Sequence, residues 1–216
     1  MRSDQVVVRL VNAVVMSRGF PLLSGVDLEI ERASLNVVTG ANGAGKTSLL
    51  RLLGGLDSLT SGEGSVVGVD LLDGDLRSLR RRVGWLGHEG SFYADLSVRE
   101  NLVFAARALG RPVDDVASAV ERVGLTHRID TTTKQLSAGQ RRRLGLAWLL
   151  VRRPELWLLD EPYASLDDAG REFFDHLLGD VLAGGATVVV SAHDPLRSSD
   201  LAPRNLQMVG GRVRVS

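Results

Sequence analysis

Short runs of apolar residues recur along this chain, and the spacing within each run predicts the element that it forms. Valines dominate residues 6–15 with some polar alternation, and residues 26–30 alternate apolar with acidic side chains. Both patterns are typical of strands. Two later runs, 155–159 and 186–191, are mostly apolar rather than alternating. Parallel strands that are buried on both faces have this pattern, so we expect an α/β fold.

A different periodicity fills the middle of the chain. Beyond residue 97 the apolar residues recur at helical spacing and predict three successive helices. The triplet Arg141–Arg143 in the third helix is interpreted as a solvated helix face. This layout predicts an α/β core, residues 1–89 and 151–216, which is interrupted by an α-helical lobe at about 90–150.

Composition and charge narrow the classes of partner. The chain has 216 residues, of which 44% are hydrophobic, and this suits a single globular domain with room for a smaller lobe. Its 26 basic and 26 acidic residues balance to a net charge of zero. A sequence-independent grip on nucleic acid requires a basic footprint, so we expect no nucleic-acid partner. The chain has no cysteine, which excludes disulfides and thiolate metal sites.

No apolar run is long enough for a membrane-spanning helix. The longest runs, such as 144–151, fall far short of the roughly 18 residues that a span requires. Near the N-terminus, Arg2 and Asp4 precede an alternating stretch rather than the apolar segment of a signal peptide. We therefore expect a protein of the cytoplasmic side, whose membrane association depends on a partner.

A complete phosphate-binding motif lies between an apolar run at 34–39 and helically spaced leucines at 48–56. The sequence GANGAGKT matches G-x-x-x-x-G-K-[ST], in which the glycines let backbone N–H groups point at nucleotide phosphates. Lys46 then reaches the β- and γ-phosphates, and the Thr47 hydroxyl ligates Mg²⁺. The predicted cofactors are ATP and Mg²⁺. The expected phosphate-binding residues are Gly40, Ala41, Asn42, Gly43, Ala44, Gly45, Lys46, Thr47 and Ser48.

Two acidic residues, Asp160 and Glu161, directly follow the apolar run at 156–159. Ligands bind at the carboxyl ends of strands in open α/β sheets, so these side chains are placed for chemistry. We expect Asp160 to hold Mg²⁺ through its water shell. Glu161 is expected to be the general base that deprotonates the attacking water, a role worth on the order of 10²–10⁴ in rate. Together with the phosphate-binding motif, these features still leave kinases, GTPases and helicases open.

The segment Leu136-Ser137-Ala138-Gly139-Gln140 resembles the LSGGQ signature of ABC ATPases, with alanine as its third residue. It precedes a helix expected to begin near Gln140, so it forms a second helix N-terminus that can bind an anion. Serine is also a common N-cap of ordinary helices. The resemblance implies a head-to-tail homodimer in which Ser137, Ala138, Gly139 and Gln140 clamp the γ-phosphate of the ATP bound by the partner chain.

Further residues match the ABC pattern. Ser165-Leu166-Asp167 resembles the D-loop, and His193 resembles the switch histidine that contacts the γ-phosphate and Glu161. The family implies a P-loop NTPase core, with a mainly parallel sheet and an antiparallel N-terminal β-region, plus the helical lobe. In most members a glutamine that contacts Mg²⁺ stands where this chain has Glu89. A carboxylate can still ligate Mg²⁺, so Glu89 is the third candidate metal ligand beside Thr47 and Asp160. The adenine contact falls to Phe20 or to Arg18, and the sequence does not decide between them.

Three longer sequence runs that include the motifs are similar to one branch of the family. The runs Trp85–Glu89, Leu136–Arg143 and Leu156–Asp167 look like the ATP-binding subunit of the haem exporter of cytochrome c maturation. That resemblance implies integral-membrane permease partners, and a peripheral position on the cytoplasmic face of the inner membrane. Two alternatives are an exporter of another cargo and a soluble ABC ATPase of an assembly pathway, such as iron–sulfur cluster formation. A binding-only module is disfavoured because Glu161 and His193 are both present.

Overall fold

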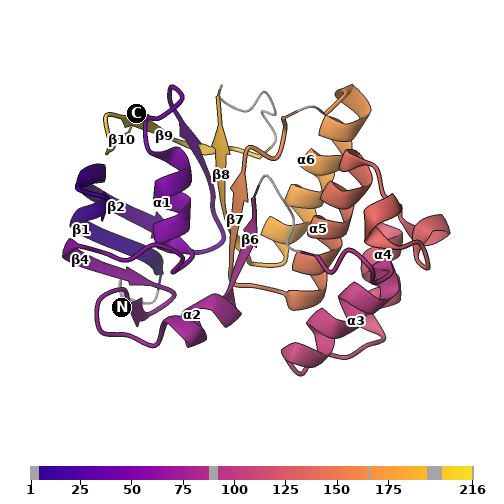
Figure 1. Ribbon diagram of the computed structural model, residues 1–216. Coiled ribbons are helices and arrows are strands. Elements are labelled where there is room, and N and C mark those ends of the chain that lie inside the picture. The colour runs from indigo at the N-terminus through magenta and orange to yellow at the C-terminus, as the bar shows by residue number, and fades with distance from the viewer. Residues whose placement is uncertain (1–4, 88–91, 165, 194–200, 216) are drawn as a thin grey trace. The chain divides into compact units, whose positions relative to one another are not determined.

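The chain forms two compact units, and each is described here by itself (Figure 1). The larger unit comprises Met1–Trp85 with Glu155–Ser216, and the smaller unit is Leu86–Pro154. Sheets dominate the larger unit and helices the smaller one, which confirms the predicted α/β class. The computed structural model describes residues 5–87, 92–164, 166–193 and 201–215.

A six-stranded sheet organises the larger unit, in the spatial order β10-β9-β3-β8-β7-β6. Strands β9, β3, β8 and β7 run parallel, and β10 is antiparallel to β9 at one edge. Leu158 and Val189, in the middle of adjacent strands, are completely buried, and this burial explains the unbroken apolar runs. The strands are β3 Leu35–Thr39, β6 Val83–Leu86, β7 Leu156–Asp160, β8 Thr187–Ala192, β9 Arg204–Val209 and β10 Arg212–Val215.

A second, antiparallel sheet has the order β2-β1-β4-β5. Its two longest strands form a hairpin that turns at Arg18 and Gly19, both of which have positive φ angles. The alternating pattern seen at 26–30 is therefore the second half of a longer strand. The strands are β1 Val6–Ser17, β2 Phe20–Glu31, β4 Ser61–Val66 and β5 Val69–Asp70.

Helix α1, Lys46–Leu53, contacts strands of both sheets and carries the centre of the core. Its residues Leu49, Leu50, Leu52 and Leu53 are fully buried in one cluster with side chains from β1, β2, β3 and β7. Figure 1 shows α1 between the two sheets of the larger unit. The helix therefore fixes the glycine loop that precedes it against a rigid scaffold. The same unit also contains α2, Leu76–Arg82, and α6, Asp168–Ala183.

The smaller unit consists mainly of three helices, as the periodicity predicts. These are α3 Val98–Ala108, α4 Asp115–Arg122 and α5 Ala138–Arg152, with short 3-10 turns at Thr126–Arg128 and Thr133–Gln135. α5 contacts both other helices along its buried face. In the part of the chain that the structure describes, no helix combines the length and the hydropathy needed to cross a membrane.

One interpretation of this unit is wrong. The triplet Arg141–Arg143 does not form a solvated face, because Arg142 and Arg143 are partly buried. The Arg143 guanidinium donates to the carbonyl oxygen of Val123 at 2.8 Å, and that of Arg141 donates to the carbonyl of Leu136. Long arginine stems cover apolar surface while their heads satisfy backbone carbonyls, and a residue pattern does not reveal this.

Candidate functional site

The predicted phosphate-binding loop connects the end of β3 to the start of α1. Gly40, Gly43 and Gly45 have φ angles of 152°, 76° and 107°, which glycine adopts far more readily than other residues. A Cβ atom on Gly40 would collide with the carbonyl oxygen of Met208, and one on Gly45 would lie 3.0 Å from the carbonyl oxygen of Leu22. The loop is therefore held closely between β2 and β9, and only glycine fits at these two positions.

Lys46 begins α1 and is almost completely buried, with 6% of its surface exposed. A buried ammonium group is stable only when hydrogen bonds satisfy it. Its Nζ donates to the carbonyl oxygens of Gly40 at 2.7 Å and Ala41 at 3.3 Å. These bonds keep the positive charge inside the loop that is predicted to hold the phosphates.

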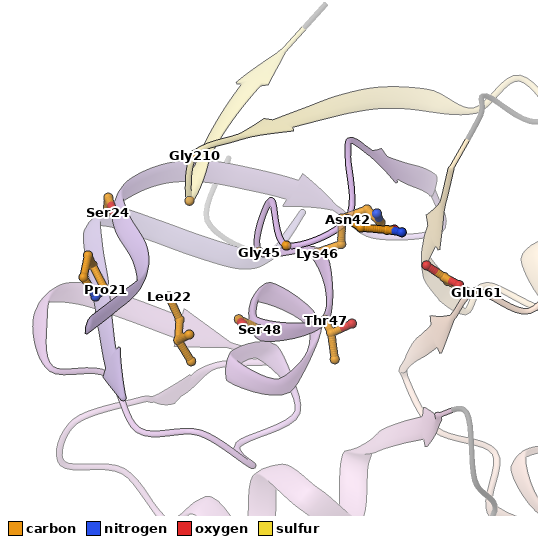
Figure 2. Close-up of a pocket in the computed structure, with 12 residues that line it drawn as sticks. Pro21, Leu22, Ser24, Asn42, Gly45, Lys46, Thr47, Ser48, Glu161 and Gly210 are labelled. Atoms are coloured by element: carbon orange, nitrogen blue, oxygen red, sulfur yellow. The ribbon is translucent and has the colours of Figure 1, made fainter. Parts of the chain in front are cut away.

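A pocket of about 620 Å³ opens over this loop, a size in the range of ordinary ligand pockets (Figure 2). Thr47 and Ser48 reach it from the first turn of α1, and Glu161 borders it from the end of β7. The two residues predicted to contact adenine, Phe20 and Arg18, do not line the pocket. Phe20 is 75% exposed. The lining residues are Pro21, Leu22, Ser24, Asn42, Gly43, Gly45, Lys46, Thr47, Ser48, Glu161, Gly210 and Gly211.

Thr47 and Asp160 form the oxygen-rich part of the site. The Thr47 hydroxyl donates to Oδ2 of Asp160 at 3.0 Å and lies 3.3 Å from its Oδ1. Hydroxyl and carboxylate oxygens are the donors that Mg²⁺ prefers, and Mg²⁺ usually keeps several waters. Within the described residues no group of three or more His, Cys, Asp or Glu side chains is arranged to hold a metal ion. The residues present therefore fit a Mg²⁺ ion that is held by few protein oxygens and completed by phosphate and water.

Glu161 and His193 are brought together as the family pattern implies. Nε2 of His193 lies 3.3 Å from Oε1 of Glu161, at the ends of the adjacent strands β8 and β7. Glu161 has a φ angle of 49°, in the left-handed region that is uncommon for residues other than glycine. Strained backbone of this kind gathers at functional sites. The two side chains form a candidate base and a group that orients it.

The signature segment lies in the smaller unit, at the N-terminus of α5. The Ser137 hydroxyl accepts from the backbone N–H of Gln140 at 3.2 Å, and Oε1 of Gln140 accepts from the N–H of Ser137 at 2.9 Å. This reciprocal capping box starts the helix at Ala138, two residues earlier than expected. Ser137, Ala138 and Gly139 are exposed, so this positively polarised helix end faces solvent.

Comparison with known proteins assigns the family. The ABC transporter family model matches residues 23–164. The chain is 41% identical to the cytochrome c biogenesis ATP-binding export protein CcmA of Rhodopseudomonas palustris over 180 residues, which cover 82% of this chain and 87% of that protein. This chain belongs to the ABC transporter family. The CcmA protein of Nitrobacter hamburgensis is 42% identical over 199 residues, which cover 89% and 93%.

Solved structures of ABC cassettes share this fold. The dimeric structure of a bacterial ABC transporter cassette has a TM-score of 0.87 and 25% identity, covering 96% of each chain. A dimeric post-hydrolysis cassette bound to ADP and Pi has a TM-score of 0.86 and 26% identity. The predicted P-loop core and ATPase activity are thereby confirmed, and this ABC chain is an ATP-hydrolysing cassette.

The structure gives no geometry for two of the predicted residues. Glu89, at the position of the family glutamine, and Ser165 of the D-loop segment both lie outside the described residues. The D-loop's Asp167 is described, and its Oδ1 caps α6 by accepting from the N–H of Gly170 at 2.8 Å. Asp167 therefore anchors the chain that leads away from Glu161.

One wall of the pocket is not predicted by the sequence motifs. Pro21, Leu22 and Ser24 come from β2, and Gly210 and Gly211 form the turn between β9 and β10. The N–H of Gly211 donates to the carbonyl oxygen of Ala44 at 3.0 Å, so this turn braces the phosphate-binding loop. A pair of glycines between two alternating segments is a hairpin signal that would have revealed the turn.

Proposed function

We propose that this cassette is the ATP-hydrolysing subunit of a membrane exporter for cytochrome c biogenesis, with haem as the exported cargo. The observation that carries the proposal is the 41–42% identity, over most of both chains, to proteins named as cytochrome c biogenesis ATP-binding export proteins. The cassette would act through integral-membrane permease subunits, bound peripherally at the cytoplasmic face of the inner membrane.

ATP would bind over the glycine loop. The loop N–H groups and the N-terminus of α1 receive the phosphates, and Lys46 exchanges its carbonyl partners for β- and γ-phosphate oxygens. Thr47 and Asp160 would hold Mg²⁺, which supplies positive charge against the phosphate oxygens when bound. Among the wall residues from β2 and the β9–β10 turn, Ser24 has the one polar side chain. The adenine ring would therefore meet a mostly apolar surface there.

Hydrolysis then depends on the carboxylate of Glu161. Its Oε1, held 3.3 Å from His193, accepts the proton of a water that attacks the γ-phosphorus in line with the leaving ADP. His193 orients that carboxylate and reaches the γ-phosphate from the end of β8. The exposed N-terminus of α5, with Ser137 and Gly139, receives the γ-phosphate of the ATP held by a second copy. Two sites are completed by two chains in a head-to-tail dimer.

The substitution Glu161→Gln tests the catalytic assignment. The amide keeps the shape of the side chain but cannot accept the proton, so the turnover of ATP should fall by at least about 100-fold. ATP binding should persist, and an ATP-bound dimer should accumulate on gel filtration. Glu172→Gln, on the exposed surface of α6, is the matched control and should hydrolyse ATP like the wild type. A Glu161→Gln chain with normal turnover would remove Glu161 from the role of base.

A genetic experiment tests the cargo. Deletion of the gene from its host should abolish c-type cytochromes, which carry covalent haem and are detected on haem-stained gels. The wild-type gene and the Glu172→Gln control should restore them, whereas Glu161→Gln should not. Normal cytochromes in the deletion strain would exclude this role. Recovery of the chain with soluble assembly proteins, rather than with a membrane subunit, would favour the iron–sulfur alternative.

A further inference from the structure

Ser191, on β8, contacts both candidate carboxylate residues of the site. Strands β7 and β8 are parallel neighbours, and their register places Ser191 beside Asp160. Its hydroxyl donates to Oδ1 of Asp160 at 2.6 Å and accepts from the backbone N–H of Glu161 at 2.8 Å. The residue is completely buried. One hydroxyl, which can donate once and accept twice, therefore bridges two consecutive residues of the hydrolysis site.

The hydrogen bond from Ser191 determines which oxygen of the Asp160 carboxylate is left to face the candidate Mg²⁺ position. Oδ1 is taken up by the Ser191 hydroxyl at 2.6 Å, whereas Oδ2 is the nearer oxygen to the Thr47 hydroxyl. A carboxylate fixed at one oxygen by a short hydrogen bond cannot rotate freely about its terminal bond. Ser191 thus presents Oδ2 to the position beside Thr47 where a hard cation fits.

The bond from Glu161 holds a strained backbone. A residue other than glycine with a φ angle of 49° persists only when its surroundings over-determine it. The Glu161 N–H is fixed by Ser191, and its Oε1 is fixed by His193, two residues further along the same chain segment. The end of β8 therefore holds Glu161 at its backbone and at its carboxylate.

We propose that Ser191 is a positioning residue for ATP hydrolysis, whose hydroxyl orients the Asp160 carboxylate and fixes the backbone of Glu161. The proposal rests on the roles assigned above to Asp160 and Glu161. It predicts a defect in turnover and in the use of Mg²⁺, not in the capture of nucleotide by the glycine loop.

The test compares Ser191→Ala with the wild type in steady-state ATPase assays across ATP and Mg²⁺ concentrations. Loss of a partner that orients a metal ligand typically costs about 10–100-fold in activity or metal affinity. We expect kcat to fall about tenfold or more and the Mg²⁺ concentration for half-maximal activity to rise several-fold. KM for ATP and the binding of a fluorescent nucleotide without Mg²⁺ should stay within about twofold of the wild type. Ser191→Thr, which keeps the hydroxyl on a β-branched side chain suited to a strand, should restore both values.

Thr187→Ala is the matched control on the same strand. Thr187 is 1% exposed and its Oγ1 accepts from the N–H of Ala33 at 3.0 Å, far along β8 from the site. This variant should lose stability in thermal unfolding but keep the wild-type kcat and Mg²⁺ dependence. An equal loss of kcat in Thr187→Ala and Ser191→Ala would show a general weakening of the strand and overturn the proposal.

Three further outcomes separate this proposal from the proposed function. A normal kcat and Mg²⁺ dependence in Ser191→Ala, while Glu161→Gln is inactive, overturns the role of Ser191 alone. The same holds if Ser191→Thr is as slow as Ser191→Ala. Normal hydrolysis by Glu161→Gln instead overturns the assignment of the base, whatever Ser191→Ala does.

Discussion

Ser137 has a structural role and a proposed functional one, and substitution can separate them. Its hydroxyl caps α5 within the smaller unit, whereas its exposed position is proposed to receive a partner's γ-phosphate. Ser137→Ala removes the cap, and Ser137→Asp replaces it with an equally good cap that carries a negative charge. The two variants should therefore change stability and activity in opposite order.

The stability effect follows from the capping box. Replacing a capping serine by alanine costs about 1 kcal/mol, which lowers the Tm of a chain of this size by about 2–4 °C. Ser137→Asp keeps an acceptor for the Gln140 N–H and places a negative charge at the positive end of α5, so its Tm should equal or exceed that of the wild type.

The activity effect is electrostatic. A unit negative charge about 4 Å from another, near a protein surface with an effective dielectric constant of about 20, is repelled by about 4 kcal/mol. At about 1.4 kcal/mol for each factor of ten, the closed dimer is weakened on the order of 10³-fold. ATPase of Ser137→Asp should therefore fall at least about 100-fold at saturating ATP, while Ser137→Ala should lose much less.

Both effects are tested by measuring thermal unfolding, nucleotide binding and steady-state ATPase on the same preparations of each variant. Ser137→Asn is the control for charge: it caps the helix without adding a charge, so it should keep more activity than Ser137→Asp. Ser97→Ala is the control for capping, because Ser97 and Glu100 form the same box at the start of α3. If Ser137→Asp hydrolyses ATP like the wild type, α5 does not meet a phosphate, and the head-to-tail model loses its support.

Two pH-dependent predictions follow from other contacts. Arg82, and also Arg32, hold the pKa of Glu155 below its ordinary value of 4.5 despite partial burial, so this ion-pair stabilisation is present above that pH and is lost as the pH falls through the folded-state pKa. Glu155→Gln should cost about 1 kcal/mol at pH 7 in urea unfolding, a value already reduced because Glu155 is 37% exposed, and the difference should vanish in acid. Burial and the hydrogen bond to Asp175 raise the pKa of Tyr163 far above its ordinary value of 10.0. Wild-type stability should therefore fall as the pH rises above about 10, and Tyr163→Phe should abolish this contribution and cost about 1 kcal/mol at pH 7. The Tyr163 prediction would be contradicted if the free energy of unfolding of Tyr163→Phe equalled that of the wild type at every pH.

The sequence predicts those strands best that are buried on both faces. The runs 34–39, 155–159 and 186–191 match β3, β7 and β8 to within a residue, because a strand with no solvent face admits few polar residues. The start of β2 was missed because residues 20–25 do not alternate. Helix α2 was missed for a related reason: four of its seven residues are arginines, and only Leu79 is buried.

The site divides in the same way between what one segment encodes and what the fold brings together. The glycine loop and the pair Asp160 and Glu161 are contiguous, so their chemistry is legible as a motif. Ser191 has meaning only through the register of β7 and β8, because a buried serine in an apolar strand carries no signal of its own. A shift of that register by one residue would turn Ser191 to the other face of the sheet and leave Asp160 without this donor. Positioning residues of this kind follow from strand pairing, so they become visible only when the neighbours of each carboxylate are known.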